Sequence, residues 1–280
     1  MKMEKKHMHK WNGIDSDKIE KVENRVLSVG NMFDDALVVM SNLIARATTK
    51  WSLEETKMFL CTISKIKTRD ENNWVTLKKT DIQEKLGITP QNGSWMREKF
   101  KNMMTKSYVQ FDGKNNTELE WHDGFVMYEV KSTKKTISVK FNETYLPFFD
   151  QLPNHFTEFY LEYVKDFTRL SSYNLYVFLC SWHDPDYLVQ NKKISKSELP
   201  KIFNLKEGEY WRNYGKENAR FHWSDFEKRC LNPAIEEIKE LSAEGKCDMW
   251  IESCEKIKKG KTVLGYDIRY SFIDKEGFRK

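Results

Sequence analysis

The chain has 280 residues, of which 39% are hydrophobic, 32% are charged and 14% are aromatic, including nine Trp. This composition excludes a largely disordered chain and predicts a folded protein long enough for two domains. Lys and Arg number 47 against 42 Asp and Glu, a formal net charge of +5, so any surface for a polyanion must come from local clusters of cations.

The sequence contains no pattern typical of a targeting segment, a membrane span, a disulfide framework or a cysteine-based zinc site. The N-terminus, MKMEKKHMHKWNG, is basic but no apolar segment follows it, and no stretch is long enough to cross a bilayer. We therefore expect a cytoplasmic protein without membrane contact. The five cysteines are odd in number and none forms a CxxC pair, which argues against a disulfide framework or a zinc finger. We expect buried or idle thiols and neither a metal nor a cofactor.

The first part of the chain predicts a tail followed by two helices. Residues 1–30 are polar and rich in Lys and Glu, which indicates a polar N-terminal extension. Apolar residues then recur at helical spacing over 36–47 and again over 53–66, which predicts two amphipathic helices in succession. Ser52 and Glu55 have the spacing of a capping box at the start of the second helix.

The pattern that follows is that of a winged helix-turn-helix. A β-like run over 74–77 precedes a short helix, which Thr80 would cap and Gly87 would end, and a longer helix over 94–106. Between residues 118 and 141 the apolar period changes to two around the polar turn KSTKK, which predicts a β-hairpin. In a winged helix-turn-helix the second helix enters the major groove and the hairpin lies along a phosphate backbone.

The second half repeats this plan. Pro147 and Pro153 break the pattern, so we place the boundary near residue 150, with winged-helix domains over 31–150 and 151–280. The segments in order are an apolar helix over 159–182, a short helix in KKISKSELPKIFNL, a long helix in FHWSDFEKRCLNPAIEEIKELS, and two strands between 248 and 273 around KIKKGK. The expected fold class is α+β, with tandem winged-helix domains.

The long helix of the second half has a face suited to reading bases. Its apolar positions form one stripe, and the polar residues that lie away from that stripe are Ser224, Lys228, Arg229, Asn232 and Lys239. Arg grips guanine O6 and N7 with two parallel bonds, and Asn does the same to adenine N6 and N7. Taken alone, such a face is more often merely solvated, but the winged-helix context favours DNA. Pro233 predicts either a kink in this helix or the start of a new one.

The corresponding helix of the first half is less basic. On a helical wheel of this segment, the outer side carries Ser94, Arg97 and Lys101, with Glu98 beside them. Trp95 and Trp223 stand at the start of the two long helices and could stack on bases, yet large aromatics in this position are more often core anchors, which is the interpretation we adopt.

Two lysine-rich turns lie in the predicted hairpins. A hairpin tip brings ammonium groups within reach of phosphates, although lysines on edge strands also deter aggregation, so each turn alone is ambiguous. The lysines concerned are Lys131, Lys134 and Lys135 in the first hairpin and Lys256, Lys258, Lys259 and Lys261 in the second.

Four segments occur in the order of a known family: ALVVMSNLIARATTKWSLEETKMFLCTISKI, TISVKFNETYLPFF, FTRLSSYNLYVFLCSW and WSDFEKRCLNPAIEEIKELS. From about residue 31 to 273 they resemble the theta-type plasmid replication initiators of the Rep_3 (RepB-like) superfamily. The last segment is the most specific, because the family's DNA-recognition helix similarly has an aromatic, a basic pair, Leu, Pro-Ala and Glu-Ile. The matching residues are Phe226, Lys228-Arg229, Leu231, Pro233-Ala234 and Glu237-Ile238.

The resemblance implies tandem winged-helix domains that bind directly repeated origin sequences, called iterons, in double-stranded DNA. It implies origin opening and recruitment of host partners, namely a replication initiator and a helicase or its loader. It also implies a monomer-dimer equilibrium, with monomers active at the origin and dimers associated with autoregulation of transcription.

Two other functions stay open on the sequence alone. A tandem winged-helix transcriptional repressor would use the same surface chemistry, and only repeated sites beside an AT-rich element on the same replicon would distinguish an initiator from it. A rolling-circle relaxase needs two metal-binding His and a nucleophilic Tyr; His7-Met8-His9 matches this pattern formally, in a Lys-rich tail without strand signal. Since the sequence also has no GxxxxGK(S/T) loop, we expect a binding protein and no enzyme.

Overall fold

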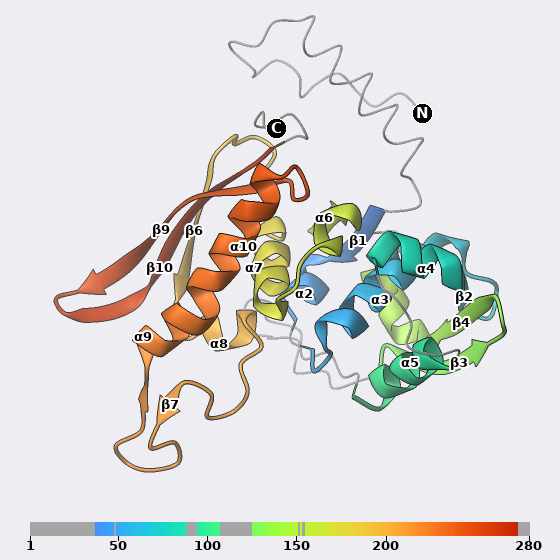
Figure 1. Cartoon of the computed structure of the whole chain (residues 1–280), viewed down its shortest axis with the longest axis horizontal. Coiled ribbons are helices and arrows are strands. Elements are labelled where there is room, and N and C mark those ends of the chain that lie inside the picture. The colour runs from blue at the N-terminus through green and yellow to red at the C-terminus, as the bar shows by residue number, and fades with distance from the viewer. Residues whose placement is uncertain are drawn as a thin grey trace, which may run out of the picture. The chain divides into compact units, whose positions relative to one another are not determined.

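The computed structural model describes residues 37–273 except 48, 88–93, 107–124, 151 and 153–154. The polar extension expected over 1–30 and the His pair of the relaxase-like pattern lie outside the described residues. Within these residues helices alternate with small antiparallel sheets, and the expected α+β class is confirmed (Figure 1).

The first half contains the complete set of winged-helix elements. They are α3 (Leu53–Ile63), β2 (Trp74–Lys78), α4 (Lys79–Leu86), α5 (Trp95–Lys106), β3 (Met127–Ser132) and β4 (Thr136–Phe141), with short 3-10 turns η3 (Ile66–Thr68) and η5 (Glu143–Phe148). The strands form one antiparallel sheet in the order β2-β4-β3, so the hairpin β3–β4 is the wing.

Local signals explain where two of these helices begin and end. Ser52 Oγ accepts from the Glu55 N–H at 3.3 Å and Glu55 Oε2 accepts from the Ser52 N–H at 2.7 Å, which confirms the capping box of α3. Gly87 ends α4 in the left-handed conformation with φ +61°, as expected. The expected cap by Thr80 is wrong, because α4 already begins at Lys79, directly after β2, and the Lys79 N–H donates to the carbonyl of Lys135 in the wing.

The helix expected over 36–47 is also wrong in its first part. Leu37–Ser41 form strand β1, and only Asn42–Ala45 form a helix, α2. Val38 and Met40 are buried in alternation with their neighbours, and the β-branched pair Val38-Val39 suits a strand. The partner of β1 is the antiparallel strand β5 (Phe156–Tyr160), which lies more than a hundred residues further along the chain.

The second half repeats the order of elements with one addition. Its elements are α6 (Glu162–Lys165), α7 (Leu170–Cys180), β6 (Gln190–Ser195), α8 (Leu199–Ile202), β7 (Trp211–Arg212), β8 (Arg220–Phe221), α9 (Trp223–Phe226), the π-helical segment η6 (Glu227–Leu231), α10 (Asn232–Ala243), β9 (Met249–Lys259) and β10 (Thr262–Phe272). The sheet order β6-β10-β9 corresponds to β2-β4-β3 of the first half. The small hairpin β7–β8 has no counterpart among the described elements of the first half.

Helix α7 is buried on nearly every side, which is why its sequence is apolar all round rather than striped. The ring of Tyr176 packs against those of Phe159 and Phe167, with ring centroids 5.7 and 5.6 Å apart. Its hydroxyl donates to the Asp248 carboxylate at 2.8 Å. The α7 carbonyl of Leu179 accepts from Tyr270 of β10 at 3.1 Å. These contacts fix the wing strands β9 and β10 on the helical core that carries them.

Candidate nucleic-acid interface

The long helix of the second half presents the face that its sequence predicts. Phe226, Cys230, Ala234 and Ile238 are buried in one stripe. The exposed residues across from this stripe include Ser224, Lys228, Arg229 and Asn232, followed by Glu236 and Glu240. Lys239 is half-buried and lies on the later part of the helix, with its ammonium 6.0 Å from the ring of Trp250. Four of the five predicted base-facing residues therefore belong to the first ten residues of the helix.

A π-helical turn lies in the middle of this face. Residues Glu227–Leu231 have π geometry, and α10 begins at Asn232 with Pro233 in its first turn. Proline has no N–H, and inside a regular helix its ring clashes with the carbonyl four residues earlier, here that of Arg229. A wider turn before the proline relieves this clash. Pro233 lies in the first turn of α10, and the backbone stays helical from α9 through the π turn into α10.

Glu227, in the π turn, connects the helix to the wing. Its carboxylate pairs with Lys256 of β9 at 2.7 Å and accepts from the hydroxyl of Tyr266 of β10 at 2.5 Å. Burial and this hydrogen bond raise the pKa of Tyr266 above its usual range, so the phenol stays protonated as a donor. The sequence predicts Lys256 at the hairpin tip. This prediction is wrong, because Lys256 lies within β9 and is paired with the Glu227 carboxylate.

The wing of the second half carries its remaining lysines at its end. Lys258 and Lys259 end β9, Lys261 follows in the turn, and all three are exposed. Gly260 between them has φ +60°, which a two-residue turn of this kind requires. Strands of eleven residues at about 3.4 Å each reach roughly 35 Å, close to one turn of B-DNA.

The wing of the first half is shorter, and one of its lysines already contacts other side chains. β3 and β4 have six residues each, with exposed Lys134 and Lys135 in the turn between them. Lys131 lies within β3, where its ammonium is 3.9 Å from the ring of Trp74 and 3.9 Å from Glu129. This lysine, like Lys256, therefore has a partner within the fold.

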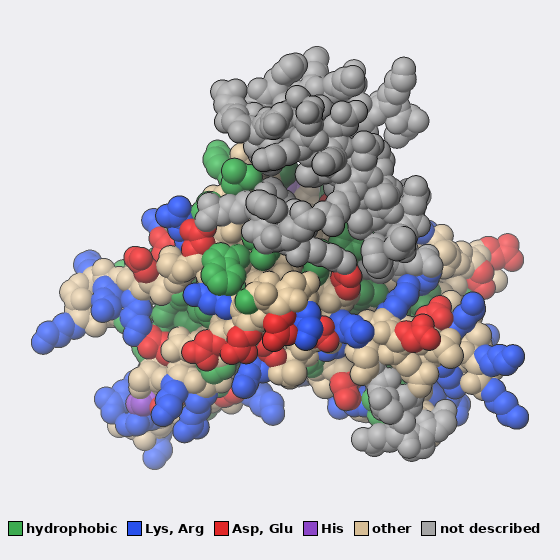
Figure 2. Space-filling view, turned by 45° about the horizontal axis from the view of Figure 1, so that its top comes forward, with side chains coloured by type: hydrophobic (Ala, Val, Ile, Leu, Met, Phe, Trp, Pro, Cys, Tyr) green, Lys and Arg blue, Asp and Glu red, His purple; other side chains and the backbone are tan. Residues whose placement is uncertain are grey.

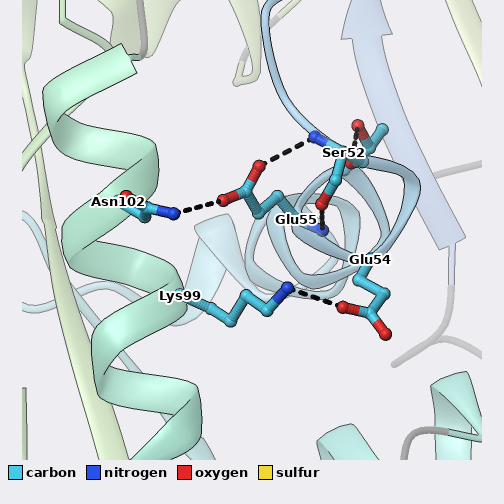
Figure 3. Close-up of polar contacts among 6 residues, drawn as sticks. Ser52, Glu54, Glu55, Lys99 and Asn102 are labelled. Atoms are coloured by element: carbon cyan, nitrogen blue, oxygen red, sulfur yellow. Dashed lines mark hydrogen bonds and ion pairs between the residues drawn. The ribbon is translucent and has the colours of Figure 1, made fainter.

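The helix α5 of the first half uses part of its polar surface to hold α3. Lys99 pairs with Glu54 at 2.7 Å, and Asn102 donates to Glu55 at 3.3 Å (Figure 3). The Glu55 carboxylate therefore connects the capping box of α3 to α5. On its outer side Ser94, Arg97 and Lys101 are exposed as predicted. The ammonium of Lys101 lies 3.6 Å from Glu98, which reduces the positive charge of this face.

Both tryptophans at the helix starts are core anchors, as predicted. Trp95 and Trp223 are partly buried against the core. Trp223 lies in a group of rings with Phe221 at 4.6 Å, Phe226 at 5.8 Å and Tyr266 at 6.1 Å, and the ammonium of Lys196 lies 4.8 Å from its ring. The packing of Trp223 fixes the start of the long helix of the second half.

Besides the two wings, the structure has a third hairpin with exposed cations, β7–β8 between α8 and α9, which the sequence analysis did not predict. Its exposed cations are Arg212, Lys216 and Arg220. The one local signal is Asn213-Tyr-Gly215, a turn sequence with aromatic and basic residues on both sides of it. In the space-filling view, Lys and Arg side chains gather over the wing tips and over the region of β7 (Figure 2).

Comparison with known proteins identifies the family of this chain. The model of the family described as initiator replication protein, WH1, matches residues 37–180, more than half of the chain. The chain belongs to the Rep3 family of initiator replication proteins. A second model, described as initiator Rep protein, WH2, matches residues 195–270 and covers the long helix and its wing. The tandem winged-helix architecture expected from the sequence is thereby confirmed.

One solved structure shares the fold, and two others are similar to a lower degree. The Pi initiator protein, whose crystal structure is a complex with iteron DNA, is 17% identical, with a TM-score of 0.64 over 85% of this chain and 98% of that chain. Domains 2 and 3 of RctB, known from two structures, are 13% and 12% identical with TM-scores of 0.45 and 0.40, over 79% and 78% of this chain and 82% and 80% of those chains. No curated protein matches the chain.

Two absences concern only the residues that the structure describes. No group of three or more His, Cys, Asp or Glu among them is placed to hold a metal ion. No helix in the described ranges is both long and apolar enough to cross a membrane.

Proposed function

We propose that this chain is a plasmid replication initiator that binds iterons in double-stranded DNA. The observation that carries the proposal is the exposed face of Lys228, Arg229 and Asn232 on a long helix whose other side is buried and which the wing adjoins. A base-reading helix needs donors on one face and a fixed orientation, and a wing needs cations at its end. The iteron complex of the Pi initiator, a protein of the same fold, supports this assignment.

The roles of the individual residues follow from their positions. Arg229, Lys228 and Asn232 contact base edges, with Ser224 and Lys239 at the ends of the same helix. Lys258, Lys259 and Lys261 contact phosphates along one flank, and Lys134 and Lys135 do so in the first half. Arg97, Lys101 and Ser94 make weaker contacts because Glu98 lies among them. Lys131 and Lys256 reach phosphate only by leaving their present partners.

The wider function extends from this DNA contact. The chain acts in the cytoplasm by binding rather than by catalysis: it opens the origin, recruits the host replication initiator and a helicase or its loader, and represses its own promoter as a dimer. The domain division near residue 150 and the 1–30 extension are part of this proposal. Origin opening without ATP relies on DNA deformation, since deformation energy depends on sequence and pyrimidine–purine steps such as TA unstack readily.

The test begins with selection of duplexes from a random library by the full chain. We expect a single enriched motif that recurs as direct repeats in the replicon that encodes the chain. Lys228→Ala/Arg229→Ala should abolish enrichment, whereas Arg69→Ala, which removes a partly buried ion pair with Asp150, should not. Absence of any enriched motif with the unmodified chain would refute the proposal.

A second experiment separates initiation from simple repression. A plasmid without its own replicon, carrying the repeats and the adjoining AT-rich DNA, is supplied with the chain from a second locus. An initiator maintains the plasmid, whereas a repressor silences a promoter over the repeats and leaves the plasmid to be lost.

A further inference from the structure

The β7–β8 hairpin interrupts the helix-turn-helix of the second half. Helices of this motif are usually joined by about three or four residues, but residues 203–222 separate α8 from α9 here. The hairpin ends at Phe221, and the long helix α9–η6–α10, which we call the reading helix, begins at Trp223 (Figure 1). The insertion therefore lies at the N-terminus of the helix that faces DNA.

Aromatic packing fixes the hairpin on this helix. Trp211 is paired with Phe221 across the two strands, with ring centroids 5.7 Å apart. Phe221 in turn lies 4.6 Å from Trp223 and 5.6 Å from Phe226, and Tyr210 lies 5.7 Å from Phe226. The hairpin is thus seated on the reading helix through its aromatic side.

The opposite side of the hairpin presents two arginines. Arg212 and Arg220 are cross-strand partners, and successive residues of a strand point to opposite faces, so the two guanidinium groups share the face turned away from the aromatic pair. Both side chains are exposed, and neither forms an ion pair within the described residues. Like charges directly opposite one another destabilise a strand pair. An anion between them would remove this penalty.

The carboxylates of the insertion do not neutralise these arginines. Glu207 accepts from the hydroxyl of Tyr214 at 2.5 Å, and Glu209 accepts from the backbone N–H of Lys206 at 2.9 Å. Between the two paired strands the turn holds one cation, Lys216, and one carboxylate, Glu217, both exposed. The segment from Trp211 to Phe221 therefore keeps an excess of positive charge.

We propose that the β7–β8 hairpin is a phosphate clamp, in which Arg212 and Arg220 bind the DNA backbone just outside the groove that the reading helix enters. This inference rests on the proposed function. The N-terminal residues of a reading helix contact base edges, so the segment immediately before them lies at the edge of the groove, where a backbone passes. Arginine forks bind phosphate oxygens in pairs. An acidic protein offers the same chemistry, but the position beside the reading helix favours DNA.

The test compares the full chain with two double variants on the duplex that the unmodified chain selects. Arg212→Ala/Arg220→Ala removes the clamp, and Lys67→Ala/Lys246→Ala removes two exposed cations that lie outside the long helices, the wings and the β7–β8 hairpin. Affinity is measured across a salt series on selected and scrambled duplexes, and hydroxyl-radical footprints are recorded. We expect the clamp variant to lower the salt slope by about two, at about 0.9 per phosphate, to weaken both duplexes equally, and to shorten the footprint at one end.

The alternative results each have a fixed meaning. If the unmodified chain binds its duplex and the clamp variant keeps the slope and footprint of the control variant, the hairpin does not contact DNA and the inference is overturned while the proposed function stands. Loss on the selected duplex alone would mean that the arginines read bases, which also overturns the clamp. If the unmodified chain selects no duplex, the proposed function itself has failed.

Discussion

The second winged helix should dominate sequence discrimination, and Arg229→Ala tests this most directly. Arg229 is exposed on the π turn beside Lys228, and its side chain forms no hydrogen bond or ion pair within the described residues. Its removal should therefore change the free energy of unfolding by no more than about 0.5 kcal/mol. A bidentate contact with guanine contributes about 1–3 kcal/mol of discrimination, so Kd for the cognate repeat should rise about 5- to 140-fold.

The assay is fluorescence anisotropy on cognate and scrambled duplexes at one salt concentration, with thermal unfolding as a control for folding. Preference at one base pair should relax in Arg229→Ala, while Arg97→Ala, on the exposed face of α5, should affect both duplexes slightly and equally. The reasoning is refuted if Arg229→Ala loses the same small amount on both duplexes and Arg97→Ala destroys discrimination. In that case the first half contains the reading helix.

Four further outcomes are expected. Lys258→Ala, at the end of the long wing, should weaken cognate and scrambled duplexes alike and lower the salt slope by about one; an unchanged slope in a salt titration would remove this lysine from the interface. Phe226→Ala should lower the free energy of unfolding by about 3–5 kcal/mol in a urea titration, because the ring is fully buried among Phe203, Tyr210 and Phe221; a loss below about 1 kcal/mol would contradict this packing. Burial raises the pKa of the Cys230 thiol to about 12 and of Cys61 to about 11, and since only the thiolate reacts, alkylation of the native protein at pH 8 should be slow at both and should accelerate as the pH rises towards these values; rapid labelling at pH 8, read by mass spectrometry, would show that the sites open. The purified chain should neither nick supercoiled plasmid in magnesium or manganese nor hydrolyse ATP, and nicking that is lost in His7→Ala/His9→Ala would establish a relaxase.

Local rules account for most of the fold that the sequence predicted. The capping box at Ser52, the left-handed stop at Gly87 and the period-two wings depend on residues a few positions apart, and all three are present. Strand β1 was mistaken for helix because its apolar residues satisfy both periods and its partner β5 is distant in sequence. Burial against that partner decides the outcome, and a single sequence does not contain this information.

The same distinction applies to the interface. The exposed face of the long helix follows from one helical wheel, so Lys228, Arg229 and Asn232 were placed correctly on its outer side. The pairing of Lys256 with Glu227 joins residues that are far apart in sequence, and no charge pattern indicates it. The arginine face of β7–β8 was overlooked because two-residue strands are too short to produce a periodic signal.

The π turn has a consequence for moving DNA specificity between relatives. A π turn holds one residue more than an α-helical turn, and each residue of an α-helix advances the face by about 100°. The wider turn between Glu227 and Leu231 absorbs the extra residue, so Asn232 and Ile238 keep the faces that they would have in a regular helix one residue shorter. A gap-free alignment with such a helix displaces them by one position, or about 100°. A specificity graft should therefore exchange the stretch from Trp223 through Pro233 as one block, because transplanting single residues along a gap-free helical alignment would move them to the wrong face.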